Sequence, residues 1–230
     1  MRKTFKVKNP YRLDQDIQQD VHIGTDLTLD YSNSPWVALD TEYLSFNPLQ
    51  DQLCVIQICS KESEESDSLR VEILYVFDNP ETPNLNAVLE NESIEKIFHV
   101  YTADMHRIEL DRDVTINGAV FDTKVAARIA WTNTRDHGMK SLIRMFVDPN
   151  FDQKDTEKGL GDWEVGPEQW TNEQVYYMMQ DVLYLDALRH RILEMAERRG
   201  SEVLIHQTME ILPRISDLYK FGFSESILGY

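Results

Sequence analysis

Two carboxylates, Asp40 and Glu42, lie one residue apart in the segment VALDTEYLSF, residues 37–46. The apolar residues before them predict a buried strand. On a strand, residues two apart face the same way and lie roughly 6.6 Å apart along the chain. Two anionic groups on one rigid face suit a hard divalent cation such as Mg²⁺ or Mn²⁺, which would offset the cost of burying like charges together. The alternative is that both reach solvent or pair with Lys or Arg.

Two later segments carry further acidic residues. The segment KIFHVYTADMHRIEL runs from a predicted strand into a helix and places Asp104 in the first helical turn, where a carboxylate also favours the helix dipole. In YYMMQDVLYL, Tyr177 and Asp181 are four residues apart and therefore share one helix face. Taken alone, each pattern also fits an ordinary helix residue.

The three segments together resemble the three motifs of the DEDDy 3′–5′ exonucleases. These motifs are D-x-E on a first strand, an aspartate in an FH-x4-D segment, and Y-x3-D on a late helix. FDTKVAARI (121–129) and GDWEVGPEQWTNEQVYYMMQDVLYL (161–185) resemble the ribonuclease D branch of the family, and the resemblance covers about residues 30–198. The related DEDDh group would have a histidine five residues before the last aspartate. Here that residue is Tyr176, so the tyrosine version fits.

The resemblance implies two divalent cations, Mg²⁺ or Mn²⁺, held by four carboxylates: Asp40, Glu42, Asp104 and Asp181. It also implies that Tyr177 positions the attacking water. Because a free tyrosine has a pKa near 10, we expect it to orient the water rather than remove its proton.

Three further residues are implied to contact the substrate. In the family, positions such as Thr41 and Leu44 touch the terminal nucleotide through backbone amides and apolar stacking, and His99 matches a histidine that hydrogen-bonds the terminal ribose or its neighbour. The alternative for His99 is a histidine at the core edge that is bonded to backbone. Trp163 is either a stacking platform or, as we expect, a loop anchor.

The resemblance implies the ribonuclease H-like fold, and hydrophobic periodicity is compatible with it. We expect an α/β chain with a mixed central sheet, three antiparallel strands first, flanked by helices. The predicted strands are 36–42, 52–60, 71–78, 96–100 and 118–122; the predicted helices are 84–91, 102–111, 123–131, about 138–147, 171–199 and from 202 onward. We expect a catalytic domain over 1–200, including a basic N-terminal segment 1–30. Residues 201–230 would form a short helical extension and no separate helical nucleic-acid-binding domain.

Composition restricts the possible partners. The 230-residue chain carries a net charge of −17, which argues against broad binding of polyanions. The basic segment MRKTFKVKNPYR could follow a phosphate backbone; the alternative is a solubilising or sheet-covering segment. Cys54 and Cys59 have an odd spacing on a strand and should not pair. We expect no membrane association, because apolar runs are short, and a cytoplasmic setting.

The leading hypothesis is a metal-dependent 3′–5′ exoribonuclease that hydrolyses single-stranded RNA from its 3′ end by a two-metal mechanism and releases nucleoside 5′-monophosphates. Short or locally unpaired substrates and modest affinity fit the acidic charge. The alternatives are a Werner-like 3′–5′ exodeoxyribonuclease and a catalytically weak homologue that only binds. The motifs favour neither RNA nor DNA, and the sequence predicts no oligomeric state.

Overall fold

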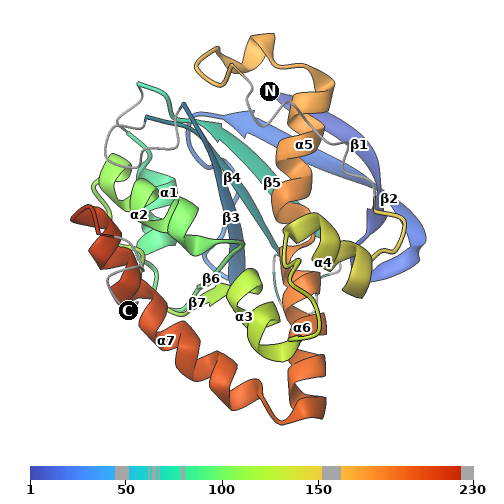
Figure 1. Cartoon of the computed structure of the whole chain (residues 1–230). Helices are drawn as coiled ribbons and strands as arrows, with labels where there is room; N and C mark the ends of the chain where they lie inside the picture. The colour runs from blue at the N-terminus through green and yellow to red at the C-terminus, as the bar shows by residue number, and fades with distance from the viewer. Residues whose placement is uncertain are drawn as a thin grey trace.

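A mixed β-sheet runs through the centre of the molecule (Figure 1). The computed structural model describes residues 1–44, 52–61, 63, 66, 68–78, 81–151 and 162–223. Within these residues the sheet has seven strands in the order β1-β2-β5-β4-β3-β6-β7. The strands are β1 Arg2–Asn9, β2 Arg12–Gly24, β3 Trp36–Tyr43, β4 Leu53–Lys61, β5 Leu69–Tyr75, β6 Glu95–Phe98 and β7 Val120–Asp122.

The central strands β3, β4 and β5 form the antiparallel meander that the sequence predicts. Strand β4 is buried along its whole length, and its register places Gln57 opposite Asp40. Strands β6 and β7 then extend the sheet in parallel from β3. Cys54 and Cys59 are both buried and free, as their spacing predicts.

The N-terminal segment differs from the expectation, because it forms two strands of the sheet. Strands β1 and β2 pair as an antiparallel hairpin, and β2 joins β5 in parallel. The basic residues of β1 face acidic residues of β2: Lys6 and Lys8 approach Asp16 at 2.8 and 2.7 Å, and Arg2 pairs with Asp20. The hairpin therefore neutralises much of its own positive charge, which favours the structural alternative over a phosphate-binding segment.

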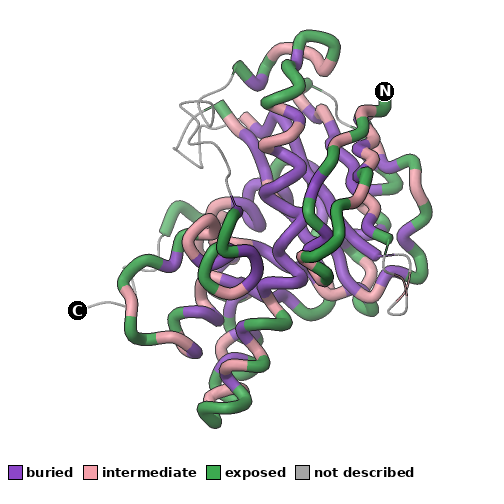
Figure 2. Tube along the Cα trace, turned by 90° about the vertical axis from the view of Figure 1, so that its right-hand side faces the viewer, coloured by how far each residue is buried: buried purple, intermediate pink, exposed green. Residues whose placement is uncertain are grey.

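Helices cover the central strands β3 to β7, which are largely buried, whereas much of the β1–β2 hairpin is exposed (Figure 2). Helix α5 packs against β3, β4 and β5, and α2 packs against β3, β4 and α7. The helices are α1 Pro83–Glu90, α2 Tyr101–Arg112, α3 Thr123–Ala130, α4 Met139–Phe146, α5 Asn172–Leu183, α6 Leu185–Arg199 and α7 Glu202–Lys220. In the part of the chain that is described, no helix has the length and apolarity needed to cross a bilayer.

The long helix predicted over 171–199 is divided at Tyr184. Its start and end agree with the sequence: Thr171 and Gln174 form a capping box, and Gly200 ends α6 with φ +70°. Between them, α5 stops at Leu183 and α6 begins at Leu185. The division follows from packing, since α5 lies on the sheet whereas α6 packs mainly against α3. The Tyr184 ring packs edge-on to Phe151 at 5.0 Å.

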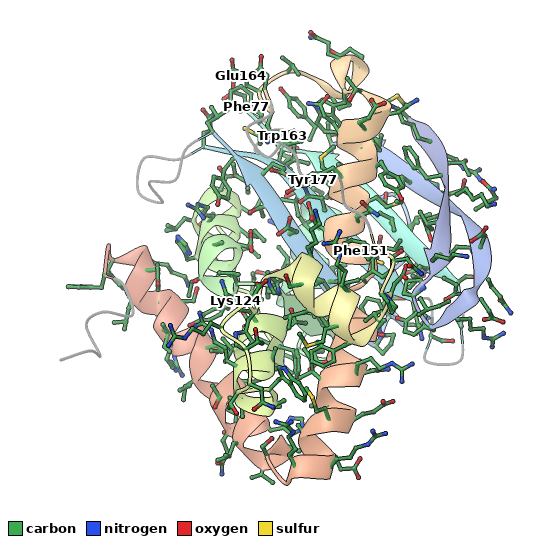
Figure 3. The ribbon with its side chains drawn as sticks, turned by 45° about the vertical axis from the view of Figure 1, so that its right-hand side comes forward. Phe77, Lys124, Phe151, Trp163, Glu164 and Tyr177 are labelled. Atoms are coloured by element: carbon green, nitrogen blue, oxygen red, sulfur yellow. The ribbon has the colours of Figure 1, made fainter. Side chains whose placement is uncertain are left out.

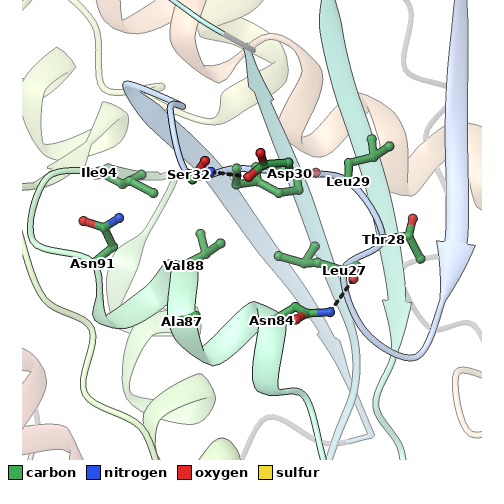
Figure 4. A pocket seen from close by; sticks show the side chains of 11 residues that line it. Leu27, Thr28, Leu29, Asp30, Ser32, Asn84, Ala87, Val88, Asn91 and Ile94 are labelled. Carbon is green, nitrogen blue, oxygen red and sulfur yellow. Dashed lines mark hydrogen bonds between the residues drawn. The ribbon is translucent and has the colours of Figure 1, made fainter.

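Helix α1 is attached to the sheet by a carboxylate from the loop that follows β2. Asp26 accepts hydrogen bonds from the backbone N–H groups of Asn84 and Leu85, both at 3.0 Å. A pocket of about 410 Å³ lies beside this attachment, between α1 and residues 27–32 (Figure 4). None of the predicted site residues lines it.

Candidate active site

The structure brings three of the predicted acidic residues together. Strand β3 supplies Asp40 and Glu42, and α5 supplies Asp181. One carboxylate oxygen of each lies within 4.8 Å of the others, although Asp181 is about 140 residues away in sequence. Glu42 and Asp181 are only 7% and 5% exposed. We call these three residues the carboxylate cluster.

The electrostatics of the carboxylate cluster suit a bound cation. Burial raises the pKa of Asp40 well above its ordinary value, and the charge of Asp181 raises it further. Burial likewise raises the pKa of Glu42, with smaller contributions from neighbouring carboxylates. Gln57 Nε2 donates a hydrogen bond to Glu42 at 3.3 Å, which opposes the shift only partly. Because hard oxygen ligands with unbalanced negative charge are what Mg²⁺ and Mn²⁺ prefer, the donor set fits a divalent cation.

Asp104 lies beside the carboxylate cluster rather than within it. It is 2% exposed in the first turn of α2 and accepts a hydrogen bond from the Thr41 hydroxyl at 2.5 Å. Burial raises the pKa of Asp104, and the charge of Asp40 adds to the shift. Thr41 also donates its backbone N–H to the Asp40 carboxylate. In this structure Thr41 therefore orients two carboxylates, and its predicted contact with a nucleotide stays a prediction.

Tyr177 lies one helical turn before Asp181 and is labelled on α5 in Figure 3. Burial and the charges of the carboxylate cluster raise the pKa of Tyr177 far above its ordinary value, and a hydrogen bond to Asp181 contributes. The phenol therefore keeps its proton at neutral pH and acts as a hydrogen-bond donor.

The sequence can now be placed among known proteins. A sequence model described as 3′–5′ exonuclease matches residues 17–197. The chain belongs to the 3′–5′ exonuclease family. The ribonuclease D of Sphingobium indicum is 27% identical over 186 residues, which cover 81% of this chain and 44% of that protein. The chain thus spans less than half the length of this curated relative.

One solved structure matches this chain nearly end to end. Brucella melitensis NrnC is 29% identical, with a TM-score of 0.78, and the match covers 91% of this chain and 98% of NrnC. NrnC bound to pGG (TM-score 0.73, 29% identity) and NrnC with bound Mg²⁺ (TM-score 0.72, 28% identity) also match, each covering 91% of this chain and 94% of that chain. The mixed sheet flanked by helices is the ribonuclease H-like fold that the sequence resemblance implied.

The remaining predicted residues of this exonuclease chain have different environments. His99 Nδ1 lies 2.8 Å from the Thr123 hydroxyl, which itself donates to the Phe98 carbonyl, so Nδ1 is the donor and Nε2 carries the lone pair. Burial lowers the pKa of His99 to about 3, so the ring is neutral. Leu44 is 44% exposed just after β3. Trp163 is 1% exposed, as expected for an anchor.

Two residues near the carboxylates were not predicted from the sequence. The Arg107 guanidinium stacks 3.9 Å from the centre of the Tyr43 ring. Its charge opposes the upward shift of the Asp104 pKa, although less than the hydrogen bond from Thr41 does. Gln57 supports Glu42. A signal for Gln57 existed, because it is the only polar residue in the apolar run LCVIQIC. Arg107 had no comparable signal in a helix with several charges.

Proposed function

We propose that this protein is a metal-dependent 3′–5′ exoribonuclease that removes nucleoside 5′-monophosphates from the 3′ end of single-stranded RNA. The observation that carries the proposal is the carboxylate cluster, whose oxygens lie within 4.8 Å of one another. Tyr177 is hydrogen-bonded to Asp181, the residue of the carboxylate cluster that lies on α5. The family membership and the ribonuclease D relative support the same reaction.

In this proposal the carboxylate cluster and Asp104 hold two divalent cations, Mg²⁺ or Mn²⁺. When bound, such a pair of cations lowers the pKa of a water molecule and stabilises the departing 3′ oxygen. Tyr177 keeps its proton and donates it in a hydrogen bond to Asp181 in the cation-free protein. With the cations bound, its hydroxyl would donate to the attacking water instead and so orient it. Gln57 and Thr41 hold Glu42 and Asp104 through their side chains. Leu44 and His99 contact the terminal nucleotide.

Short RNA substrates agree best with the surface of the molecule. The net charge is −17, and Lys6 and Lys8 are engaged by Asp16, so an extended phosphate backbone meets few free cations on the hairpin. NrnC, which matches this chain over 91% of its length, has been captured with pGG. These observations support oligoribonucleotides rather than long structured RNA as substrates.

The test uses 5′-labelled RNA and DNA of the same short sequence, with Mn²⁺ or Mg²⁺. We expect a ladder that shortens from the 3′ end on RNA, complete loss of the ladder in Asp40→Asn and Asp181→Asn, and a slower ladder in Tyr177→Phe. Asp30→Asn is the control, because Asp30 is an exposed carboxylate outside the cluster. Internal cleavage, or laddering that survives in Asp40→Asn, would contradict the proposal. If the protein degraded DNA in preference to RNA, DNA would replace RNA as the proposed substrate.

A further inference from the structure

A buried carboxylate outside the cluster holds the starts of two helices. Asp122 lies at the junction between β7 and α3 and is 0% exposed. One of its oxygens accepts the backbone N–H of Val125 at 2.8 Å and caps α3. The other accepts the backbone N–H of Tyr101, the first residue of α2, at 2.6 Å. Asp122 therefore supplies a cap to a helix that it does not belong to.

The start of α2 needs such support because its backbone is strained. Val100, the residue before α2, has φ +70° and ψ +59°. This left-handed conformation is unfavourable for a β-branched residue, and strain of this kind persists only where the surroundings impose it. Val100 also provides no side-chain cap to α2. The hydrogen bond from Tyr101 to Asp122 is thus the side-chain contact that secures the turn into the helix.

Further contacts join the same two chain segments. His99 and Thr123 are hydrogen-bonded through their side chains at 2.8 Å, and Thr123 donates to the Phe98 carbonyl at 3.2 Å. Phe98 and Asp122 are also paired across β6 and β7. The path of the chain from β6 into α2 is therefore set largely by the residues that begin α3.

The first turn of α2 carries Asp104, three residues after Tyr101. Where this helix begins decides where the Asp104 carboxylate meets Thr41. We propose that Asp122 is a positioning residue, which holds the strained start of α2 and thereby fixes Asp104 next to the carboxylate cluster. The kinetic part of its test rests on the proposed exoribonuclease function.

Asp122→Asn is the informative variant, because the asparagine amide can accept only one of the two backbone N–H groups. We expect kcat on short RNA to fall about 10- to 100-fold and Mn²⁺ affinity, measured by calorimetry, to fall by a similar factor, as for other residues that orient metal ligands. KM should stay unchanged, since the substrate contacts remain.

A matched control separates positioning from general loss of stability. Asp26 also caps a helix from a distant segment, through Asn84 and Leu85 at the start of α1, but α1 carries none of the site residues. Asp26→Asn should lower the melting temperature while leaving kcat and Mn²⁺ affinity unchanged. If Asp122→Asn behaved in the same way as Asp26→Asn, Asp122 would be a purely structural residue and the proposal would be wrong.

A second variant tests the role of the strained backbone. Glycine adopts positive φ without penalty, so Val100→Gly should let the turn into α2 persist without the carboxylate. We expect kcat of the double variant Asp122→Asn, Val100→Gly to be about fivefold or more higher than that of Asp122→Asn alone. An unchanged kcat would contradict the role of strain. If the wild-type protein did not degrade RNA, the proposed function would fail, but the Mn²⁺ affinities of the variants would still test the positioning.

Discussion

The carboxylates at the site give the cation-free protein a predictable response to pH. The pKa values of Asp40, Glu42 and Asp104 are all raised in the folded state, primarily by burial. Above their ordinary pKa, near 4, these three groups therefore bind more protons in the folded protein than in the unfolded chain. The contribution of these three groups to the free energy of unfolding therefore decreases as pH rises from about 4.

We expect Asp40→Asn to weaken this pH dependence. In EDTA, the melting temperature of the wild type should fall between pH 5 and pH 8 more than that of the variant. At pH 8 the variant should be the more stable of the two, by about 2–4 °C for each kcal/mol of repulsion removed. Mn²⁺ should stabilise the wild type at pH 8 and not the variant. If the melting temperatures of the two proteins in EDTA changed equally across this pH range, the buried charge of Asp40 would not destabilise the folded protein, and the prediction would be wrong.

At the level of elements, the N-terminal hairpin is fastened to α6 by a buried hydrogen bond. The Tyr11 hydroxyl donates to Asp186 at 2.6 Å, and Asp186 is 0% exposed. Tyr11→Phe removes the donor but keeps the ring that lies 3.9 Å from Lys61 Nζ. We expect a loss of about 1–3 kcal/mol, because a buried carboxylate loses a partner, read as a lower midpoint in urea unfolding.

Lys6→Gln provides the contrast within the same hairpin. Its ion pair with Asp16 is at the surface, where the Lys6 side chain is 66% exposed, and exposed pairs contribute little. The urea midpoint should be close to that of the wild type. If Lys6→Gln were as destabilising as Tyr11→Phe, the hairpin would be held mainly by its own surface charges rather than by its contact with α6.

For the whole molecule, the charge distribution predicts how substrate capture responds to salt. With a net charge of −17 and the hairpin lysines engaged by Asp16, few cations are free to displace counterions from RNA. At constant Mn²⁺, we expect log(kcat/KM) on short RNA to fall with log[KCl] with a slope no steeper than about −2, equivalent to about three phosphate contacts. A slope of about −4 or steeper would indicate an extended cationic surface that the described residues do not present.

The sequence by itself determined the features that depend on a few neighbouring residues. The spacing of Asp40 and Glu42 fixed a shared strand face, and that of Tyr177 and Asp181 a shared helix face. The Thr171 capping box and the Gly200 stop are likewise local, since each is built within one turn of backbone. Hydrophobic periodicity predicted the β3–β4–β5 meander because alternation along a strand reflects which side is buried.

Only the tertiary structure decided the features that depend on contacts between distant segments. The chain divides at Tyr184 because α5 and α6 pack against different partners, and residues 2–24 become strands because β2 finds an edge on β5. Thr41 reaches Asp104, and Asp122 reaches Tyr101, across gaps of 63 and 21 residues. Local preference contains no information about such pairs, because their hydrogen bonds form only once the sheet has brought the segments together.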